Sequence, residues 1–163
     1  MPGSKETFKK YINSIFIETG SGSGAGIEQA INAGFKYIYS IELHKEPFDY
    51  CVNRFKDNPN VHLMYGDSGD IMDNLLSEIN EPATFWLDGH DEDAYPIIKE
   101  LQAIGRHFIK THIIMIDDLR MFDVKKHGLN LEIIKSECIK INPSYKFYFE
   151  NGHVINDILV IKI

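Results

Sequence analysis

The sequence predicts an α/β fold in which helices cover both faces of a mostly parallel sheet. Three observations support this prediction. Five short apolar runs between residues 15 and 116 have the β-branched and aromatic content of buried strands. Segments with helical spacing separate them, and two more strand-like runs follow near the C-terminus. This alternation is typical of a Rossmann-like, three-layer α/β/α sandwich.

The order of the elements follows from the same patterns. The five parallel strands are expected at residues 15–17, 37–41, 61–65, 83–87 and 113–116. A glycine-rich loop follows the first strand and opens a helix near Ile27. The clearest of the other predicted helices have these apolar residues on one face: Phe48, Cys51, Val52 and Phe55; Ile97, Leu101 and Ile104; Leu131, Ile134, Cys138 and Ile141. Asn142-Pro143 is expected to end the last of these helices.

The C-terminal part predicts a hairpin. Residues 145–149 and 155–163 have the composition of strands, and Asn151-Gly152 between them is a pair that tolerates positive φ and favours a tight turn. The sheet is therefore expected to end antiparallel.

Large aromatic side chains are expected to pack in the core or on a face of the sheet, and both cysteines in the core, because such side chains dominate interiors. The aromatic residues concerned are Phe16, Phe85, Trp86, Tyr148 and Phe149. Two cysteines, Cys51 and Cys138, make neither a disulfide framework nor a zinc cluster.

Length and charge narrow the class of protein. A chain of 163 residues with 44% hydrophobic residues fits one globular domain over residues 1–163. No apolar run approaches the roughly 20 residues that span a bilayer, so no membrane partner is expected. The N-terminus lacks a secretory signal, which predicts a cytoplasmic location. The net charge of −7 without a basic cluster predicts that nucleic acid is not the main partner.

A carboxylate follows each of the five predicted parallel strands, directly or within two residues. These acids are Glu18, Glu42, Asp67, Asp88 and Asp117. The carboxyl ends of parallel strands line one crevice, so the five side chains are expected to converge there. They would repel one another unless a cation or hydrogen-bond donors lay between them. A single acid such as Asp67 or Asp117 has the alternative role of capping the next helix.

The first loop carries a cofactor motif, for which a simple glycine-rich linker is the alternative. Glu18-Thr19-Gly20-Ser21-Gly22-Ser23-Gly24 resembles the E/D-x-G-x-G-x-G signature of S-adenosylmethionine (SAM) enzymes, the class I methyltransferases. The resemblance implies that Glu18, Gly20, Ser21 and Gly22 bind the methionyl part of SAM. A dinucleotide pyrophosphate would be repelled by Glu18, and the loop has no Walker lysine.

Two later motifs point to adenosine. Glu42, followed by Leu43, lies about 20 residues beyond the first glycines, the spacing at which a carboxylate takes ribose hydroxyls in Rossmann folds. Gly66-Asp67-Ser68 resembles the methyltransferase Gly-Asp pair, and this resemblance implies contact with the adenine amino group. A simple turn or helix cap is the alternative for this segment.

Acids after the fourth and fifth strands resemble those of metal-dependent O-methyltransferases of the catechol and macrolide-sugar types. The resemblance implies that Asp88, Asp117 and Asp118 bind Mg²⁺, a hard cation that prefers oxygen ligands. Asp88 would also take part in cofactor binding and catalysis, and His90 would accept the substrate proton. A surface or capping role is the alternative for His90. The catechol type has Asp-Asn where this chain has Asp117-Asp118.

The motifs together predict a SAM-dependent methyltransferase that uses Mg²⁺ to methylate an oxygen of a small hydroxylated substrate such as a sugar. The substrate would be covered by residues 91–95, by residues 120–128, or by a partner subunit in a homo-oligomer. Arg120 has two possible roles, binding an acidic substrate group or balancing Asp118. The alternative functions are a non-catalytic SAM or S-adenosylhomocysteine (SAH) binder or regulatory subunit, and an NAD-linked oxidoreductase. Glu18 and the absence of a Tyr-x-x-x-Lys pair count against the oxidoreductase.

Overall fold

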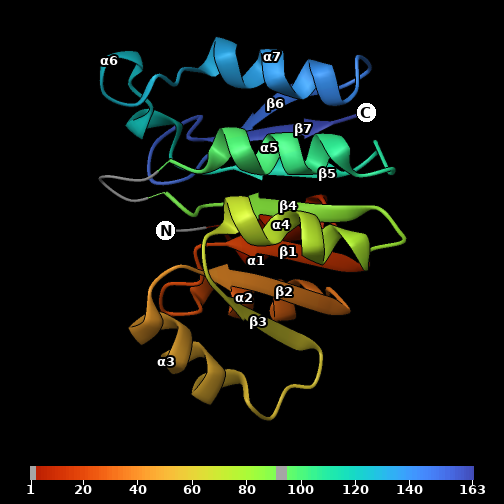
Figure 1. The fold of residues 1–163 in the computed structure, drawn as a ribbon, viewed down its shortest axis with the longest axis vertical. Coiled ribbons are helices and arrows are strands. Elements are labelled where there is room, and N and C mark those ends of the chain that lie inside the picture. The colour runs from red at the N-terminus through yellow and green to blue at the C-terminus, as the bar shows by residue number, and fades with distance from the viewer. Residues whose placement is uncertain (1–2, 91–94) are drawn as a thin grey trace.

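A computed structural model describes residues 3–90 and 95–163 of the chain (Figure 1). Within them lies one seven-stranded sheet with the order β3-β2-β1-β4-β5-β7-β6. Its strands are β1 (Ile15–Thr19), β2 (Tyr37–Glu42), β3 (Val61–Tyr65), β4 (Ala83–Leu87), β5 (Ile113–Ile116), β6 (Lys146–Glu150) and β7 (Ile158–Lys162). The first five are parallel, and β7 pairs antiparallel with both β5 and β6. The predicted parallel strands and the antiparallel end of the sheet are confirmed.

Helices cover both faces of this sheet, as predicted. They are α1 (Lys5–Lys10), α2 (Ala25–Ala33), α3 (Lys45–Phe55), α4 (Ser68–Ser77), α5 (Ile97–Arg106), α6 (Val124–His127) and α7 (Leu131–Ile141), with a 3₁₀ turn at Leu119–Met121. Helices α4, α5 and α7 share one hydrophobic core with one face of the sheet, and they lie in front of it in Figure 1. Helices α1, α2 and α3 pack in a second core on the other face. None of the described helices has the length and apolar character needed to cross a bilayer.

The two cores follow from the alternation of side chains along each strand. In β1, Ile15 and Ile17 belong to the core with α4 and α5, whereas Phe16 between them belongs to the core with α2. In β4, Phe85 and Trp86 divide in the same way. Every residue of these two strands is buried, which explains why they read as continuous apolar runs.

Helix α1 is an element that the sequence patterns did not identify. Ser4 caps it by accepting a hydrogen bond from the Thr7 amide at 3.1 Å. Its Phe8 is fully buried, with ring centroids 4.9 Å from Phe16 and 5.1 Å from Trp86. Six residues are too few for helical periodicity to show, so only the tertiary contacts of Phe8 reveal this helix.

The C-terminal hairpin is confirmed, but the predicted tight turn is wrong. Residues 151–157 join β6 to β7 as a longer loop instead of a tight Asn151-Gly152 turn, because the loop folds around the buried side chain of Asp157. The left-handed residue of this loop is Asn156, with φ 59°. Tyr148 and Phe149 are each 41% exposed, because β6 is the edge strand of the sheet. The other three aromatic residues and both cysteines are buried, as predicted.

Candidate functional site

The carboxyl ends of β1 to β4 form the wall of a cavity with a volume of about 550 Å³. Such a volume falls in the range of roughly 300–1,000 Å³ that small-molecule sites occupy. The neighbouring strands β1 and β4 are followed by helices on opposite faces of the sheet, α2 and α5. The cavity lies at this topological switch point of the strand order. Its lining includes Gly20, Gly22, Glu42, Leu43, Gly66, Asp67, Ser68, Asp88, His90 and Tyr95.

The glycine loop closes tightly on the ends of the neighbouring strands. Gly20 has φ +82°, and its amide donates to the Ile41 carbonyl at 2.8 Å. A Cβ atom at Gly20 would lie 2.4 Å from the carbonyl oxygen of Asp88. Only glycine allows both this φ and this approach. The loop after β1 and the loop after β4 are therefore in direct backbone contact on the cavity wall.

Glu42 fixes the same loop from the next strand. One of its carboxylate oxygens accepts a hydrogen bond from the Gly22 amide at 2.9 Å, and the other accepts from the His44 amide at 2.8 Å. The residue is only 5% exposed, yet it lines the cavity. Each oxygen can accept a further hydrogen bond, so the carboxylate remains able to take hydroxyl groups. Leu43, 41% exposed, supplies an apolar surface beside it.

The side chains of Glu18 and Ser21 are buried under the backbone of the glycine loop and do not line the cavity. The Ser40 hydroxyl donates to Glu18 at 2.5 Å, so the 2.6 Å contact between Ser21 and Ser40 is a hydrogen bond donated by Ser21. Burial raises the pKa of Glu18 to about 8. A Cβ atom at Gly26 would overlap Glu18 Oε1 at 1.8 Å. These polar groups hold the loop in place from below, and their contact with a ligand stays a prediction.

The segment after β3 presents Gly66, Asp67 and Ser68 to the cavity. Asp67 is the N-cap of α4, and its side chain accepts from the Gly69 amide at 2.8 Å. The capping role that the sequence left open is thus real, and it places the same carboxylate at the cavity. The Ser68 hydroxyl donates to Glu100 at 2.5 Å.

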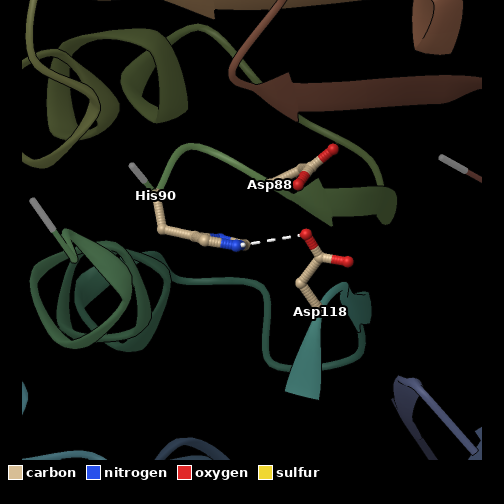
Figure 2. A group of neighbouring side chains, drawn as sticks. All are labelled: Asp88, His90 and Asp118. Carbon is tan, nitrogen blue, oxygen red and sulfur yellow. Dashed lines mark ion pairs between the residues drawn. The ribbon is translucent and has the colours of Figure 1, made fainter. Parts of the chain in front are cut away.

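Asp88, His90 and Asp118 come together in space (Figure 2), and Asp88 and His90 also line the cavity. One ligand atom from each residue lies within 4.8 Å of those of the other two. His90 Nε2 is 3.4 Å from a carboxylate oxygen of Asp118, and the His90 side chain is 5% exposed. Burial and the negative charges of Asp117 and Asp118 raise the pKa of Asp88 to about 8. This group has the donor types that a divalent cation takes.

Asp117 belongs to a second group, with Asp118 and Asp157. It accepts a hydrogen bond from the Asp118 amide at 2.8 Å and is 1% exposed. Burial raises the pKa of Asp117 to about 7. Arg120 forms ion pairs with both Asp118 and Asp157. The guanidinium therefore balances Asp118, one of the two roles that the sequence allowed, and Asp117 is not in the same group of ligand atoms as Asp88 and His90.

Two residues near the site, Asp157 and Glu100, were not identified from the sequence. Asp157 lies in the run 155–163 that was predicted as a strand, and only the folded loop of residues 151–157 brings it to Arg120. Tyr95, the last residue of the predicted cover at residues 91–95, stacks on His90 with ring centroids 5.5 Å apart. Glu100 is different, because it falls on the same helix face as Ile97, Leu101 and Ile104, and that position signals a buried carboxyl. The proposed cover at residues 91–95 lies almost wholly outside the described residues.

Comparisons with known proteins find relatives only at the level of structure. No protein-family model matches the chain, and no curated protein matches it. An O-methyltransferase from Bacillus cereus in complex with SAH superposes with a TM-score of 0.68 at 10% identity, covering 98% of this chain and 78% of that one. An SAH-bound methyltransferase from Podospora anserina gives 0.65 at 14% identity, with 97% and 75% covered.

A third structural neighbour is not named as a methyltransferase. It is a spermidine synthase in complex with a transition-state analogue, with a TM-score of 0.64 at 11% identity, covering 95% of this chain and 54% of that one. At such identities the likeness shows a shared fold, and one fold hosts more than one reaction. The residues of the site, and not the fold, decide which reaction this chain catalyses.

Proposed function

We propose that this chain, whose fold is that of class I methyltransferases, binds SAM in the cavity and transfers its methyl group to a hydroxyl oxygen of a small substrate such as a sugar. One observation carries the proposal. The cavity is lined by adenosine-type groups, Gly20, Glu42 and Asp67, and also by Asp88 and His90, which form a polar group with the neighbouring Asp118. Two structural neighbours whose names state that they are methyltransferases contain SAH.

The cofactor wall fits SAM group by group. The Glu42 carboxylate, held by two backbone amides, takes the ribose hydroxyls. Asp67 and Ser68 receive the adenine edge, and Leu43 packs against its apolar face. The backbone of Gly20 and Gly22 lets the methionyl part approach closely. SAM supplies a methyl group on a sulfonium centre, and the residues of this wall supply orientation.

The group of Asp88, His90 and Asp118 fits a divalent cation. Asp88 and Asp118 bring carboxylate oxygens together in a half-buried place, where their repulsion has to be offset. Oxygen ligands suit Mg²⁺, and the nearby imidazole nitrogen would suit Mn²⁺ or Zn²⁺ as well. A cation at Asp88 and Asp118 would lower the pKa of a substrate hydroxyl bound to it.

His90 acts as the proton acceptor in this proposal. Its Nε2 faces Asp118, and its ring is held between Tyr95, stacked at 5.5 Å, and Phe122, edge-on at 5.9 Å. A fixed imidazole beside the acceptor hydroxyl can take the proton as the oxygen is methylated. The net charge of −7 agrees with a small molecule as substrate in preference to nucleic acid.

Calorimetric titration of SAM tests the cofactor assignment. The wild type is expected to bind SAM, and Glu42→Ala to weaken binding at least tenfold, because the ribose loses its acceptor and the Gly22 and His44 amides lose theirs. Glu132→Ala removes an exposed carboxylate of α7, with 81% of its side chain accessible, and serves as the matched control. No binding of SAM by the wild type would overturn the proposal.

Methyl transfer is then measured with labelled SAM and a panel of hydroxylated acceptors, with Mg²⁺, with Mn²⁺ and with a chelator. If the chelator abolishes methyl transfer, the result supports a divalent cation at Asp88 and Asp118. If transfer is unaffected by the chelator, the cation is removed from the proposal. Binding of SAM without transfer to any acceptor identifies a non-catalytic SAM-binding protein. Stabilisation by NADH but not by SAM points to the oxidoreductase.

A further inference from the structure

A buried carboxyl, Glu100, lies beneath the cavity. The residue is in the first turn of α5 and 1% exposed, because it shares the inward face of the helix with Ile97 and Leu101. Its neighbour Lys99 lines the cavity and lies 3.8 Å from Asp70. Glu100 therefore stands just behind the cavity wall and has no access to bulk solvent.

Glu100 lies next to two segments that form the cavity wall. The hydroxyl of Ser68, the first residue of α4, donates to Glu100 Oε1 at 2.5 Å. At Gly89, in the loop after β4, a Cβ atom would lie 3.4 Å from the same oxygen. Both Ser68 and Gly89 line the cavity. A single buried carboxylate thus supports the part of the wall where the adenine edge is proposed to bind.

The hydrogen bond to Glu100 decides what Ser68 can offer a ligand. A serine hydroxyl has one hydrogen and two lone pairs. Because the hydrogen is directed to Glu100, the oxygen can only accept toward the cavity. Asp67, the neighbouring wall residue, is also an acceptor when ionised. This end of the cavity therefore favours a ligand edge that donates, such as an exocyclic amine, over one that carries a carbonyl.

We propose that Glu100 is a specificity-determining positioning residue, which holds the Ser68 hydroxyl as an acceptor and so selects adenine over a 6-oxopurine. The inference rests on the proposed function, since it needs the purine of SAM or SAH at Asp67 and Ser68. Glu100 itself does not touch the ligand in this arrangement. Its effect passes through the orientation of one hydroxyl hydrogen.

The test compares SAH with S-inosylhomocysteine, in which a carbonyl replaces the adenine amine. Calorimetry at pH 8.5 measures both dissociation constants for the wild type and for Glu100→Ala, Ser68→Ala and the double variant. The wild type is expected to prefer SAH strongly. Each single substitution is expected to reduce the preference about tenfold, the effect of one hydrogen bond. The double variant is expected to match the single ones, because both act through one contact.

Two controls separate specificity from stability. Thr84→Val removes a buried hydroxyl that donates to the Tyr11 carbonyl at 2.6 Å, away from the cavity, and is expected to leave the preference unchanged. Ser68→Thr keeps a hydroxyl that can donate to Glu100 and is expected to retain the preference. If Glu100→Ala fails to fold, the comparison of Ser68→Ala with Ser68→Thr decides whether the Ser68 hydroxyl sets the preference for SAH.

The outcomes are distinct. Binding of SAH with an unchanged preference in Glu100→Ala or Ser68→Ala overturns this inference and leaves the proposed function intact. No binding of SAH by the wild type overturns both.

Discussion

Buried carboxyl groups are the main residue-scale feature of this protein. Burial raises the pKa of Glu18 and of Asp88 to about 8, and that of Glu100 and of Asp117 to about 7. An ionised buried carboxylate costs free energy unless donors or cations surround it. The protein offsets part of this cost with serine hydroxyls, as at Glu18 and Glu100. A cationic ligand at the cavity would offset more.

The pKa of Glu18 leads to a prediction about stability and pH. The folded state holds this proton more tightly than the unfolded state, so its contribution to stability is lost as the pH rises from about 4.5 to about 8. Glu18→Gln keeps an acceptor for Ser40 and cannot ionise. Its free energy of unfolding relative to wild type is therefore expected to rise across this window, by about 5 kcal/mol at most. Urea denaturation at several pH values measures the difference, and Glu132→Gln is the exposed control. A difference that does not change with pH contradicts the prediction.

Gly20 provides a second residue-scale prediction. Gly20→Ala places a side chain at φ +82° and 2.4 Å from the Asp88 carbonyl oxygen. The left-handed conformation alone costs about 1–2 kcal/mol, and the overlap adds to it. We expect a larger loss of unfolding free energy than for Gly128→Ala, which has φ +67° and open space around the Cβ position. SAM affinity should fall only in the Gly20 variant. Equal losses in both would show that the close approach does not matter.

At the scale of elements, the start of α4 combines capping with the site. Asp67→Ala removes the N-cap and is expected to cost about 1 kcal/mol of unfolding free energy. Asp67→Asn keeps an oxygen that can accept from the Gly69 amide, so it should retain most of this stability. The asparagine variant should nevertheless bind SAM more weakly, since the charge at the cavity is lost. Chemical denaturation and calorimetry on the two variants separate the effects, and equal stability of both would contradict the capping argument.

A pair of histidines lies at the amino ends of the inner strands β4 and β5. The Ala83 amide donates to His112 Nδ1 at 3.0 Å, so His112 donates through Nε2 to His107 Nδ1 at 2.8 Å, and His107 donates to the Ile79 carbonyl at 3.0 Å. Burial lowers the pKa of His112 to about 4. We predict that NMR finds a proton on Nε2 of both rings, with His112 unprotonated on Nδ1 at pH 7 and at pH 5.5. A titration of His112 near pH 6.5 would contradict this.

At the scale of the whole molecule, the cavity unites loops that depend on four different strands. A ligand that bridges them binds the folded state only, and it should stabilise the whole fold. SAM at 100 times its dissociation constant is expected to add about 2.7 kcal/mol to the free energy of unfolding. Thermal unfolding with SAM, SAH and NADH measures this effect, and Trp86, the only tryptophan and fully buried, reports the unfolding. A larger shift with NADH than with SAM would contradict the proposed function.

Much of the fold was predictable because its signals are local. The strands at 37–41, 61–65, 83–87 and 113–116 match the observed ones within a residue. The inner strand β4 is buried along its whole length, as a parallel strand covered on both faces should be. The strand β3 was expected to be buried as well, but it is an edge strand and none of its residues is fully buried. The short helix α1 and the long loop at residues 151–157 were not predictable, because they depend on contacts of Phe8 and Asp157 with distant residues. Tyr148 and Phe149 favour a strand whether that strand is buried or exposed. Only the order of the strands in the sheet places them on an exposed edge.

The sequence by itself determined the chemistry available at the sheet edge: a glycine loop and an acid after each parallel strand, which parallel order must bring to one side. Only the tertiary structure decided how those acids divide. Glu42, Asp67 and Asp88 line the cavity, Glu18 is buried beneath the loop, and Asp117 lies with Asp157 beside Arg120. The physical reason is that strand position sets the edge a residue reaches, whereas side-chain direction depends on packing and hydrogen bonds from segments far away in the chain.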